Sequence, residues 1–458
     1  MDGNILGRIL RGFGANAYGQ VVVAIIQLAG VPILLHYWGA RLYGEWLILS
    51  AIPSYLSMTD LGFSQSAAND MTARVGRGDR NGALAVFQSL TALVYTAAVV
   101  GLLLVALLAI FLPVGEWLHI SELSPLKIRW ILWLLAAEVL VKLAEGSSHA
   151  GFRASGEYAF HTSIYYTTLF AQQVVVWCAV TTGHGPLVAA ALFMAVRVVV
   201  TPSVAALLFW RHRYLKPGFA NASLVELRAL VRPALANVAM PLAQAFNIQG
   251  LVLVVGAVLG PVAVVVFSTL RTLTRLTLQL VVSVSHAVEP ELARAWGAGD
   301  RSLMRRMYVH SMRASFWMAL VAAVALHFLG DVIVTLWTHG KVAMDIALFD
   351  LLLLSAAASM LWYGGLSLLK AGNRHLGAAV LYVLASLAAV VMATLLLRVT
   401  GKLSDVGFAL LLMDAMMATY LLRKASALVR MSVLGLLAQI ANPWPFMRGV
   451  WRRVSNVY

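Results

Sequence analysis

Residues 262 to 288 read VAVVVFSTLRTLTRLTLQLVVSVSHAV, a stretch that is apolar and long enough to cross a bilayer as one helix. It nevertheless carries Arg271 and Arg275 about one helical turn apart, in line with Thr272, Gln279 and His286. An arginine at bilayer depth costs about 3 kcal/mol even on lenient insertion scales, so it must face a wet cavity, a partner or a ligand. Two guanidinium groups on one polar stripe predict a site for an anion.

The rest of the composition places this helix in a membrane. Of 458 residues, 61% are hydrophobic and only 12% are charged, which is too few charges to cover a globular surface. We therefore expect an all-α integral membrane protein, because open strands cannot lie in lipid. Apolar windows of about twenty residues predict about twelve spans, which begin near Ala15, Tyr43, Leu84, Ile128, Phe160, Leu187, Pro233, Val262, Met312, Ala347, Leu376 and Leu403.

The basic residues indicate the orientation. They gather in alternate connections, around positions 8–11, 74–80, 211–232, 294–306, 370–374 and 423–424. The positive-inside rule makes these connections and both termini cytoplasmic. The net charge of +15 then reflects topology and attraction to anionic phospholipids, and cations scattered over short loops do not predict nucleic-acid binding.

Two copies of one plan follow each other along the chain. Ala15-Asn16 recurs as Ala236-Asn237, Gly39 recurs as Gly260, and Gly76-Arg-Gly-Asp-Arg80 recurs as Gly297-Ala-Gly-Asp-Arg301, always at an interval of 221 residues. The constant interval predicts a duplicated six-helix unit with a central cleft between the copies. The domains expected are an N-terminal lobe (1–210), a cytoplasmic linker (211–232), a C-terminal lobe (233–424) and a basic, amphipathic interfacial tail (425–458), for which a disordered basic segment is the alternative.

The N-terminal residues resemble a known family. The order Asn16-Ala-Tyr-Gly-Gln20, Gly39, Tyr43-Gly44, Trp46, Asp60-Leu-Gly-Phe63 and Asn69 looks like the opening of Wzx-type polysaccharide flippases. These belong to the multidrug/oligosaccharidyl-lipid/polysaccharide exporter superfamily. The motifs cover about the first hundred residues, and the span count extends the likeness weakly over the rest. The resemblance implies a V-shaped transporter of the bacterial inner membrane that moves undecaprenyl-diphosphate-linked oligosaccharide to the outer leaflet for surface polysaccharide biosynthesis, whether O-antigen, capsule or exopolysaccharide.

The arginines inside the predicted spans match no motif of that family. Their functions are therefore inferred from their chemistry and their position in the membrane. Arg271 and Arg275 are expected to cradle the diphosphate, since a guanidinium is a planar fork that fits phosphate oxygens. The alternative is that they form ion pairs with acids of other helices. Arg197, in the apolar stretch 189–205, either completes this cradle or pairs with Glu138.

Several other polar residues have two interpretations each. Lys142 lies one turn from Glu138, with Glu145 on the same side, so it either adds charge to the cradle or pairs with Glu138. Glu138, Asp60 and His286 are candidates for coupling to a proton or sodium ion or for gating, and each can equally be a structural contact. A polar stripe predicts cavity lining or plain interhelical hydrogen bonds; its members are Asn237, Gln244 and Asn247, with Thr272 and Gln279 on the next span.

Three functions compete at this point. A flippase for lipid-linked oligosaccharide needs a cationic cavity, whereas a cation-coupled multidrug exporter of the same superfamily calls for an acid deep in the first helix, and residues 12 to 36 contain none. A membrane polymerase or ligase needs catalytic groups on a sizeable outer loop, and the outer connections are short. No G-x-x-x-x-G-K-[ST] loop, metal-spaced His/Cys set or catalytic constellation is evident. We therefore expect a non-enzymatic flippase without cofactor or metal.

Overall fold

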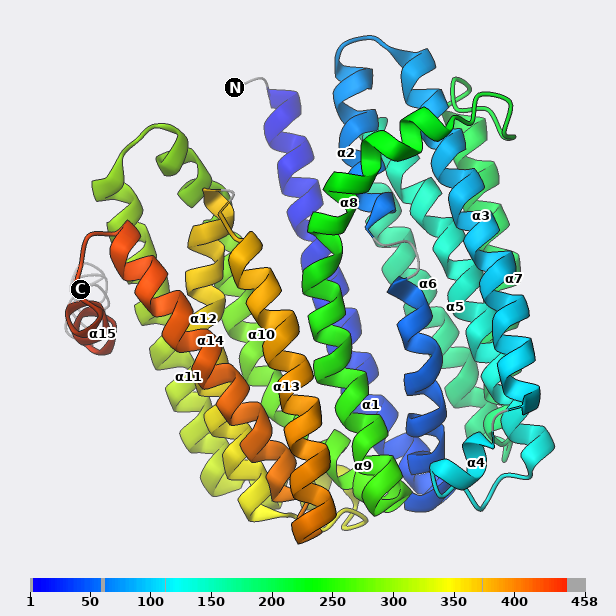
Figure 1. The fold of residues 1–458 in the computed structure, drawn as a ribbon, viewed down its shortest axis with the longest axis vertical. Coiled ribbons are helices and arrows are strands. Elements are labelled where there is room, and N and C mark those ends of the chain that lie inside the picture. Colours follow the sequence, from blue (N-terminus) through cyan, green and yellow to red (C-terminus); the bar gives the residue numbers. More distant parts are fainter. Residues whose placement is uncertain (1–2, 59–61, 112, 373, 443–458) are drawn as a thin grey trace, which may run out of the picture. The chain divides into compact units, whose positions relative to one another are not determined.

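The computed structural model describes residues 3–58, 62–111, 113–372 and 374–442, and all regular structure in these residues is helical (Figure 1). The elements are α1 (Gly3–Ser54), η1 (Tyr55–Met58), α2 (Phe63–Gly76), α3 (Arg80–Phe111), α4 (Val114–Trp117), α5 (Pro125–Ala154), α6 (Tyr158–Thr181), α7 (Pro186–Arg211), α8 (Leu224–Ala245), the π-helical turn η2 (Phe246–Gly250), α9 (Leu251–Leu259), α10 (Pro261–Gly297), α11 (Arg301–Thr338), α12 (Ile346–Ala371), α13 (Leu376–Thr400), α14 (Ser404–Leu428) and α15 (Val433–Ala441).

The chain is a multi-pass membrane protein, as its composition predicts. Nine helical segments of the described residues are long and apolar enough to span a bilayer. The first of them, Gly14–Ser57, is 44 residues long, and Gly39 divides it because its φ of 74° is not helical. Helices α5 and α6 have 30 and 24 residues but carry more polar side chains. Counted with the two arms of α1 separate, the nine segments number ten, and the predicted spans that begin near Ile128 and Phe160 correspond to α5 and α6, which are not among the nine.

The helices gather into two compact units. Unit 1 comprises 1–245 and 260–265, and unit 2 comprises 246–259 and 266–458. Within unit 1, α5 packs against α2, α3 and α7, and α1 packs against α6. Within unit 2, α14 packs along α12 and α13, and α11 lies against α12. The domain limits predicted from the linker at 211–232 stay a prediction.

The duplicated loop has the same backbone geometry in both copies. Gly78 and Gly299 adopt φ values of 83° and 70°, which glycine reaches without strain. Asp79 accepts a hydrogen bond from the backbone N–H of Gly82 at 2.8 Å, and Asp300 accepts one from Leu303 at 2.9 Å. The N–H of Leu303 and the hydroxyl of Ser302 stabilise the charged carboxylate, so the pKa of Asp300 lies below its ordinary value. Residues 221 positions apart therefore build the same helix start, as the repeat predicts.

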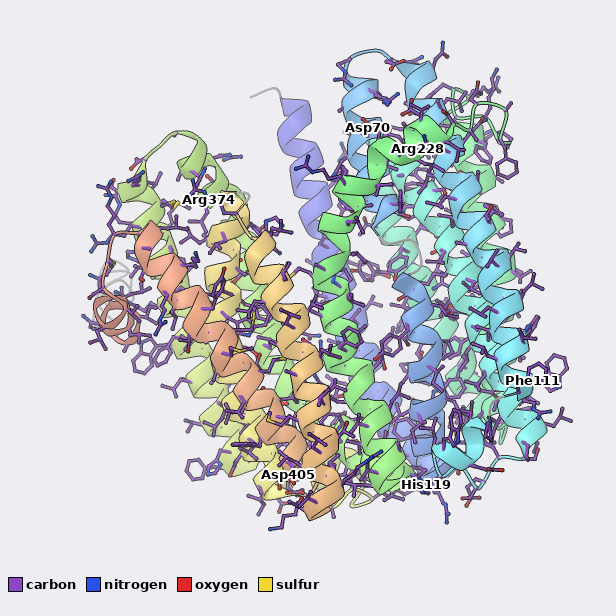
Figure 2. The ribbon with its side chains drawn as sticks, in the orientation of Figure 1. Asp70, Phe111, His119, Arg228, Arg374 and Asp405 are labelled. Carbon is purple, nitrogen blue, oxygen red and sulfur yellow. The ribbon has the colours of Figure 1, made fainter. Side chains whose placement is uncertain are left out.

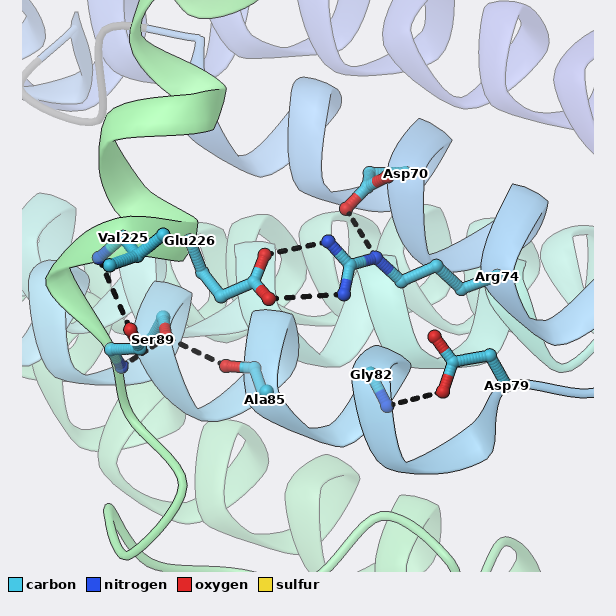
Figure 3. A network of polar contacts seen from close by, with 9 residues as sticks. Asp70, Arg74, Asp79, Gly82, Ala85, Ser89, Val225 and Glu226 are labelled. Atoms are coloured by element: carbon cyan, nitrogen blue, oxygen red, sulfur yellow. Dashed lines mark hydrogen bonds and ion pairs between the residues drawn. The ribbon is translucent and has the colours of Figure 1, made fainter.

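The connection between α7 and α8 is held against unit 1 by polar contacts. The guanidinium of Arg74 in α2 donates to Asp70 at 2.9 Å and to both carboxylate oxygens of Glu226 in α8, at 3.1 and 2.7 Å (Figure 3). On α3, Ser89 accepts a hydrogen bond from the N–H of Ser223, and Gln88 contacts the same connection. The first part of α8 is thus fixed to α2 and α3.

Apolar side chains cover the outer faces of the spans. Phe111, at the end of α3, points away from its helix and is 72% exposed (Figure 2). Such surface is normal where lipid, rather than water, is the neighbour. Cys178, the single cysteine of the sequence, is exposed on α6, so no internal disulfide can form.

Candidate functional site

Arg271 and Arg275 both lie on α10, but the structure gives them different surroundings. Arg271 is buried, whereas Arg275 is exposed. The guanidinium of Arg271 donates from Nη1 to the carbonyl oxygen of Asn247 at 2.8 Å and from Nη2 to the Asn247 side-chain oxygen. Its carbon Cζ lies 5.3 Å from the ring centre of Phe267, which adds a cation–π contact. Arg271 is therefore held in one position.

The partner of Arg271 belongs to an irregular turn. Asn247 lies in the π-helical turn η2, where the ordinary hydrogen-bond ladder of the helix is interrupted. A carbonyl left at such a turn needs another donor, because an unpaired backbone group at membrane depth costs several kcal/mol. Arg271 supplies that donor, so Asn247 is a hydrogen-bond partner of the arginine, and its predicted place in a cavity lining stays a prediction.

Arg275 keeps its charge available. In the described residues it forms no ion pair with a carboxylate, and its side chain is exposed one turn along α10 from Arg271. Thr272 lies between the two arginines, and its hydroxyl donates to the carbonyl of Ser268 in the same helix. The two guanidinium groups therefore place one fixed and one accessible cation on a single helix.

Arg197 forms an ion pair with Glu138, which was one of the two roles predicted for it. Its side chain is fully buried in α7 and donates from Nε to Glu138 and from Nη1 to Glu145, both at 2.8 Å. Glu138 also accepts a hydrogen bond from Gln172 at 3.2 Å, and Glu145 accepts one from Thr201 at 3.3 Å. One guanidinium thus holds two carboxylates of α5. The role of Arg197 in anion binding stays a prediction. Its pairing with two carboxylates does not support that role.

Lys142 does not pair with Glu138, because that carboxylate turns to Arg197. Its ammonium lies 5.3 Å from the ring centre of Tyr165. It lines a cavity of about 300 Å³ within unit 1, formed by α1, α5 and α6. The other lining residues are Asn16, Glu145, Gly146, His149, Tyr158, His161, Thr162, Tyr165 and Tyr166.

The remaining predicted residues have separate positions. Gln244 is exposed near the end of α8, and Gln279 is half-buried on α10. Asp60 lies outside the described residues. Asn237 and His286 fall in α8 and α10, but their side chains lie outside the described part of the chain.

Sequence reasoning missed two polar features. Asp414 is buried in α14, where it accepts hydrogen bonds from Trp362 at 2.9 Å and from the hydroxyl of Ser355. A lone acid in an apolar span is the same kind of signal as Arg271, so the sequence contained the information. The cavity around Tyr165 could not be foreseen, because it depends on which faces of α1, α5 and α6 meet.

Comparison with solved structures identifies the fold. A multidrug resistance transporter of the MATE family, of the MOP superfamily, in an inward-facing conformation superposes with a TM-score of 0.70 at 15% identity, over 89% of this chain and 99% of that one. The lipid II flippase MurJ in an inward closed conformation gives 0.70 at 13% identity, over 95% and 92%. The MATE multidrug transporter DinF-BH gives 0.63 at 12% identity, over 92% and 95%.

At these identities the likeness establishes the architecture. No protein-family model matches the sequence, and no curated protein sequence matches it. The chain therefore has the all-helical fold shared by these drug transporters and the lipid flippase. The proteins named are transporters rather than enzymes.

Proposed function

We propose that the chain is a flippase that carries an undecaprenyl-diphosphate-linked oligosaccharide from the inner to the outer leaflet of the bacterial inner membrane, for surface polysaccharide biosynthesis. The observation that carries the proposal is the pair of arginines on α10. Arg275 is exposed and unpaired with any carboxylate of the described residues, while Arg271 is fixed by Asn247. A charge kept at this depth without an acid needs a ligand that repays its cost.

A diphosphate fits this arrangement. The fork of donors on Arg275 matches phosphate oxygens and gives two parallel hydrogen bonds. Arg271 contributes a second positive charge, which interacts electrostatically with buried Asp414 as well. The side chain of Arg271 is already ordered, so little conformational entropy is lost when the anion binds. The fold supports the proposal as well, since the lipid II flippase shares it.

The membrane potential supplies a driving force for this direction of transport. Moving one elementary charge across 100 mV is worth about 2.3 kcal/mol, and a diphosphate carries more than one negative charge. Outward movement of the anion is downhill in a cell that is negative inside. A coupling proton or sodium ion would add to this force.

A cation-coupled multidrug exporter is the second candidate. The fold favours it equally, because the inward-facing MATE transporter and MurJ superpose with the same TM-score of 0.70. Buried Asp414 is an acid of the kind that such an exporter would need. Against it, both oxygens of Asp414 already accept hydrogen bonds from α12, and the first helix has no acid between residues 12 and 36.

The test replaces Arg275 and measures transport in liposomes. Purified Arg275→Ala protein is expected to lose at least about tenfold in the rate at which a lectin gains access to lipid-linked oligosaccharide, since a charge-assisted bidentate contact is worth more than about 1.4 kcal/mol. Arg275→Lys should recover part of the rate, because it keeps the charge and loses the fork.

Arg398→Ala is the matched control, since Arg398 is an exposed arginine in the last turn of α13. It should transport as the unchanged protein does. Full transport by well-folded Arg275→Ala would contradict the anion site. Proton-driven ethidium efflux by the unchanged protein would favour the exporter instead.

A further inference from the structure

The cavity of unit 1 has the chemistry of a site for an uncharged ligand. Among the residues that line it, Lys142 and Glu145 are the formally charged ones, and their charges cancel. The sum of formal charges stays zero when the neighbouring residues of the ion pairs are included, because Arg197 and Glu138 also carry opposite charges. Arg153, about one turn beyond His149 on α5, acts electrostatically on that histidine but does not line the cavity. An anion would add a negative charge to a lining whose own formal charges already cancel, which is costly in a low dielectric.

The two histidines of the lining can add at most one positive charge while they contact each other. Nδ1 of His149 and Nδ1 of His161 lie 3.3 Å apart. One of these two nitrogens must donate and the other must accept, so at least one of the two rings is neutral while this contact exists. The neutral ring then offers the cavity polar groups without a full charge.

The walls combine aromatic faces with neutral donors and acceptors. Tyr158, Tyr165 and Tyr166 supply flat apolar surface together with hydroxyl groups. Thr162 and Asn16 add a hydroxyl and an amide, and the hydroxyl of Tyr158 already lies 3.2 Å from the Asn16 side-chain oxygen. A volume of about 300 Å³ is at the lower end of the range for small-molecule pockets.

We infer that this cavity, formed by α1, α5 and α6, is a binding site for one uncharged sugar ring, and that Lys142 acts there as a hydrogen-bond donor to sugar hydroxyls rather than as part of an anion site. A sugar ring presents both an apolar C–H face and hydroxyls, which is the combination that tyrosines and neutral polar groups can bind. The inference deepens the proposed function, on which it rests for the source of the sugar, the glycan of the transported lipid.

The inference is tested by NMR titration of the full chain in nanodiscs with three probes, with saturation transfer for the two glycosides and phosphorus-31 line broadening for pyrophosphate, which has no carbon-bound protons. The probes are the methyl glycoside of N-acetylglucosamine, methyl glucuronide and inorganic pyrophosphate. The neutral glycoside should bind, and the glucuronide should bind no more tightly. Tyr165→Leu should weaken the neutral glycoside about tenfold, because it removes an aromatic face.

Two further variants distinguish a loss of binding from a loss of folding. Tyr158→Phe removes one hydroxyl at constant ring volume and should weaken the glycoside a few-fold. Tyr37→Leu is the control, since Tyr37 is an exposed tyrosine of α1 that does not line the cavity, and it should leave binding unchanged. The inference is overturned if no glycoside binds, if Tyr165→Leu and Tyr158→Phe both bind normally, or if the glucuronide binds more tightly and Lys142→Met removes that preference.

Pyrophosphate separates this inference from the proposed function. Its binding should be lost in Arg275→Gln and kept in Tyr165→Leu, whereas glycoside binding should show the opposite pattern. If the unchanged protein binds the glycoside but not pyrophosphate, the flippase proposal is contradicted and the sugar site stands. If the unchanged protein binds pyrophosphate but not the glycoside, only the sugar site is contradicted.

Discussion

Arg197 is the residue whose loss should harm the fold most. It is fully buried and compensates two carboxylates, Glu138 and Glu145. Arg197→Met is expected to lower the free energy of unfolding by about 3–5 kcal/mol, because both acids are then stranded. The measurement is chemical unfolding in detergent, followed by circular dichroism.

The matched control for this change is removal of the acids together with the arginine. Arg197→Met combined with Glu138→Gln and Glu145→Gln should recover most of the lost stability, since no buried charge remains. Arg275→Ala should unfold like the unchanged protein. A stable Arg197→Met single variant would show that the ion pairs contribute little to the fold.

The sequence identified these charged residues and offered Lys142 and Arg197 as alternative partners of Glu138, but it could not decide between them. Glu138 and Lys142 are one helical turn apart, which predicts mutual pairing as one alternative, yet Glu138 bonds to Arg197 in another helix. Likewise, Arg271 and Asn247 were both recognised as polar groups at depth, but their hydrogen bonds depend on the π-helical turn η2. Partners across helices depend on packing, which helical periodicity does not contain.

At the scale of elements, α15 is a short amphipathic helix attached to unit 2. Leu436 and Ile440 are buried among residues of α11 and α14. Arg313 of α11 donates from Nε and Nη2 to the carbonyl oxygen of Gln439, at 2.9 and 2.7 Å. A cation at the end of a helix also favours its dipole, so Arg313 fixes α15 at its C-terminal turn.

Arg313→Met should therefore loosen α15 while leaving the spans folded. We expect amide hydrogen exchange over 433–441 to rise by about one to two orders of magnitude, since hydrogen bonds to a charged group contribute about 1.5–3 kcal/mol. Mass spectrometry of peptic fragments measures this exchange, and Arg398→Met is the control. Unchanged protection of α15 in Arg313→Met would show that Leu436 and Ile440 hold it alone.

Helices were easier to predict than their ends. Apolar windows identified the spans, because length and hydropathy are local properties. The separate spans predicted from Ala15 and from Tyr43 imply a connection between them, but Gly39 was noted only as a repeated and family-like residue; its φ of 74° is the reason for the glycine. The basic, amphipathic tail was predicted over 425–458. Of this range, α14 takes the residues up to Leu428 and α15 occupies Val433–Ala441, and the tail beyond Asn442 lies outside the described residues.

At the scale of the whole molecule, the distribution of basic residues predicts one orientation. Reporter domains fused after Lys216 should be active only as cytoplasmic reporters, such as green fluorescent protein. Alkaline phosphatase inserted after Lys402 should be active, because the connection between α13 and α14 is expected outside. Measuring both activities in intact cells tests the prediction, and phosphatase activity after Lys216 would reverse it.

The repeat gave the sequence its strongest large-scale signal. Gly76–Arg80 and Gly297–Arg301 are recognisable because a tight loop constrains glycine and aspartate directly. Unit 1 extends to Ala245 and so includes α8, while the predicted domain limits stay a prediction. Arg74 and Ser89 explain this, since their contacts with Glu226 and Ser223 keep the first part of α8 in unit 1.

Cys178 gives this chain a practical advantage for spectroscopy. It is the single cysteine of the sequence and it is exposed on α6 in unit 1. A spin label or fluorophore can therefore be attached there without removing any native residue. One cysteine introduced at an exposed position of unit 2, such as Val399, then gives a pair of labels between which a distance can be measured. Distance distributions from that pair, recorded with and without lipid-linked oligosaccharide, would report directly how the two units are arranged during transport.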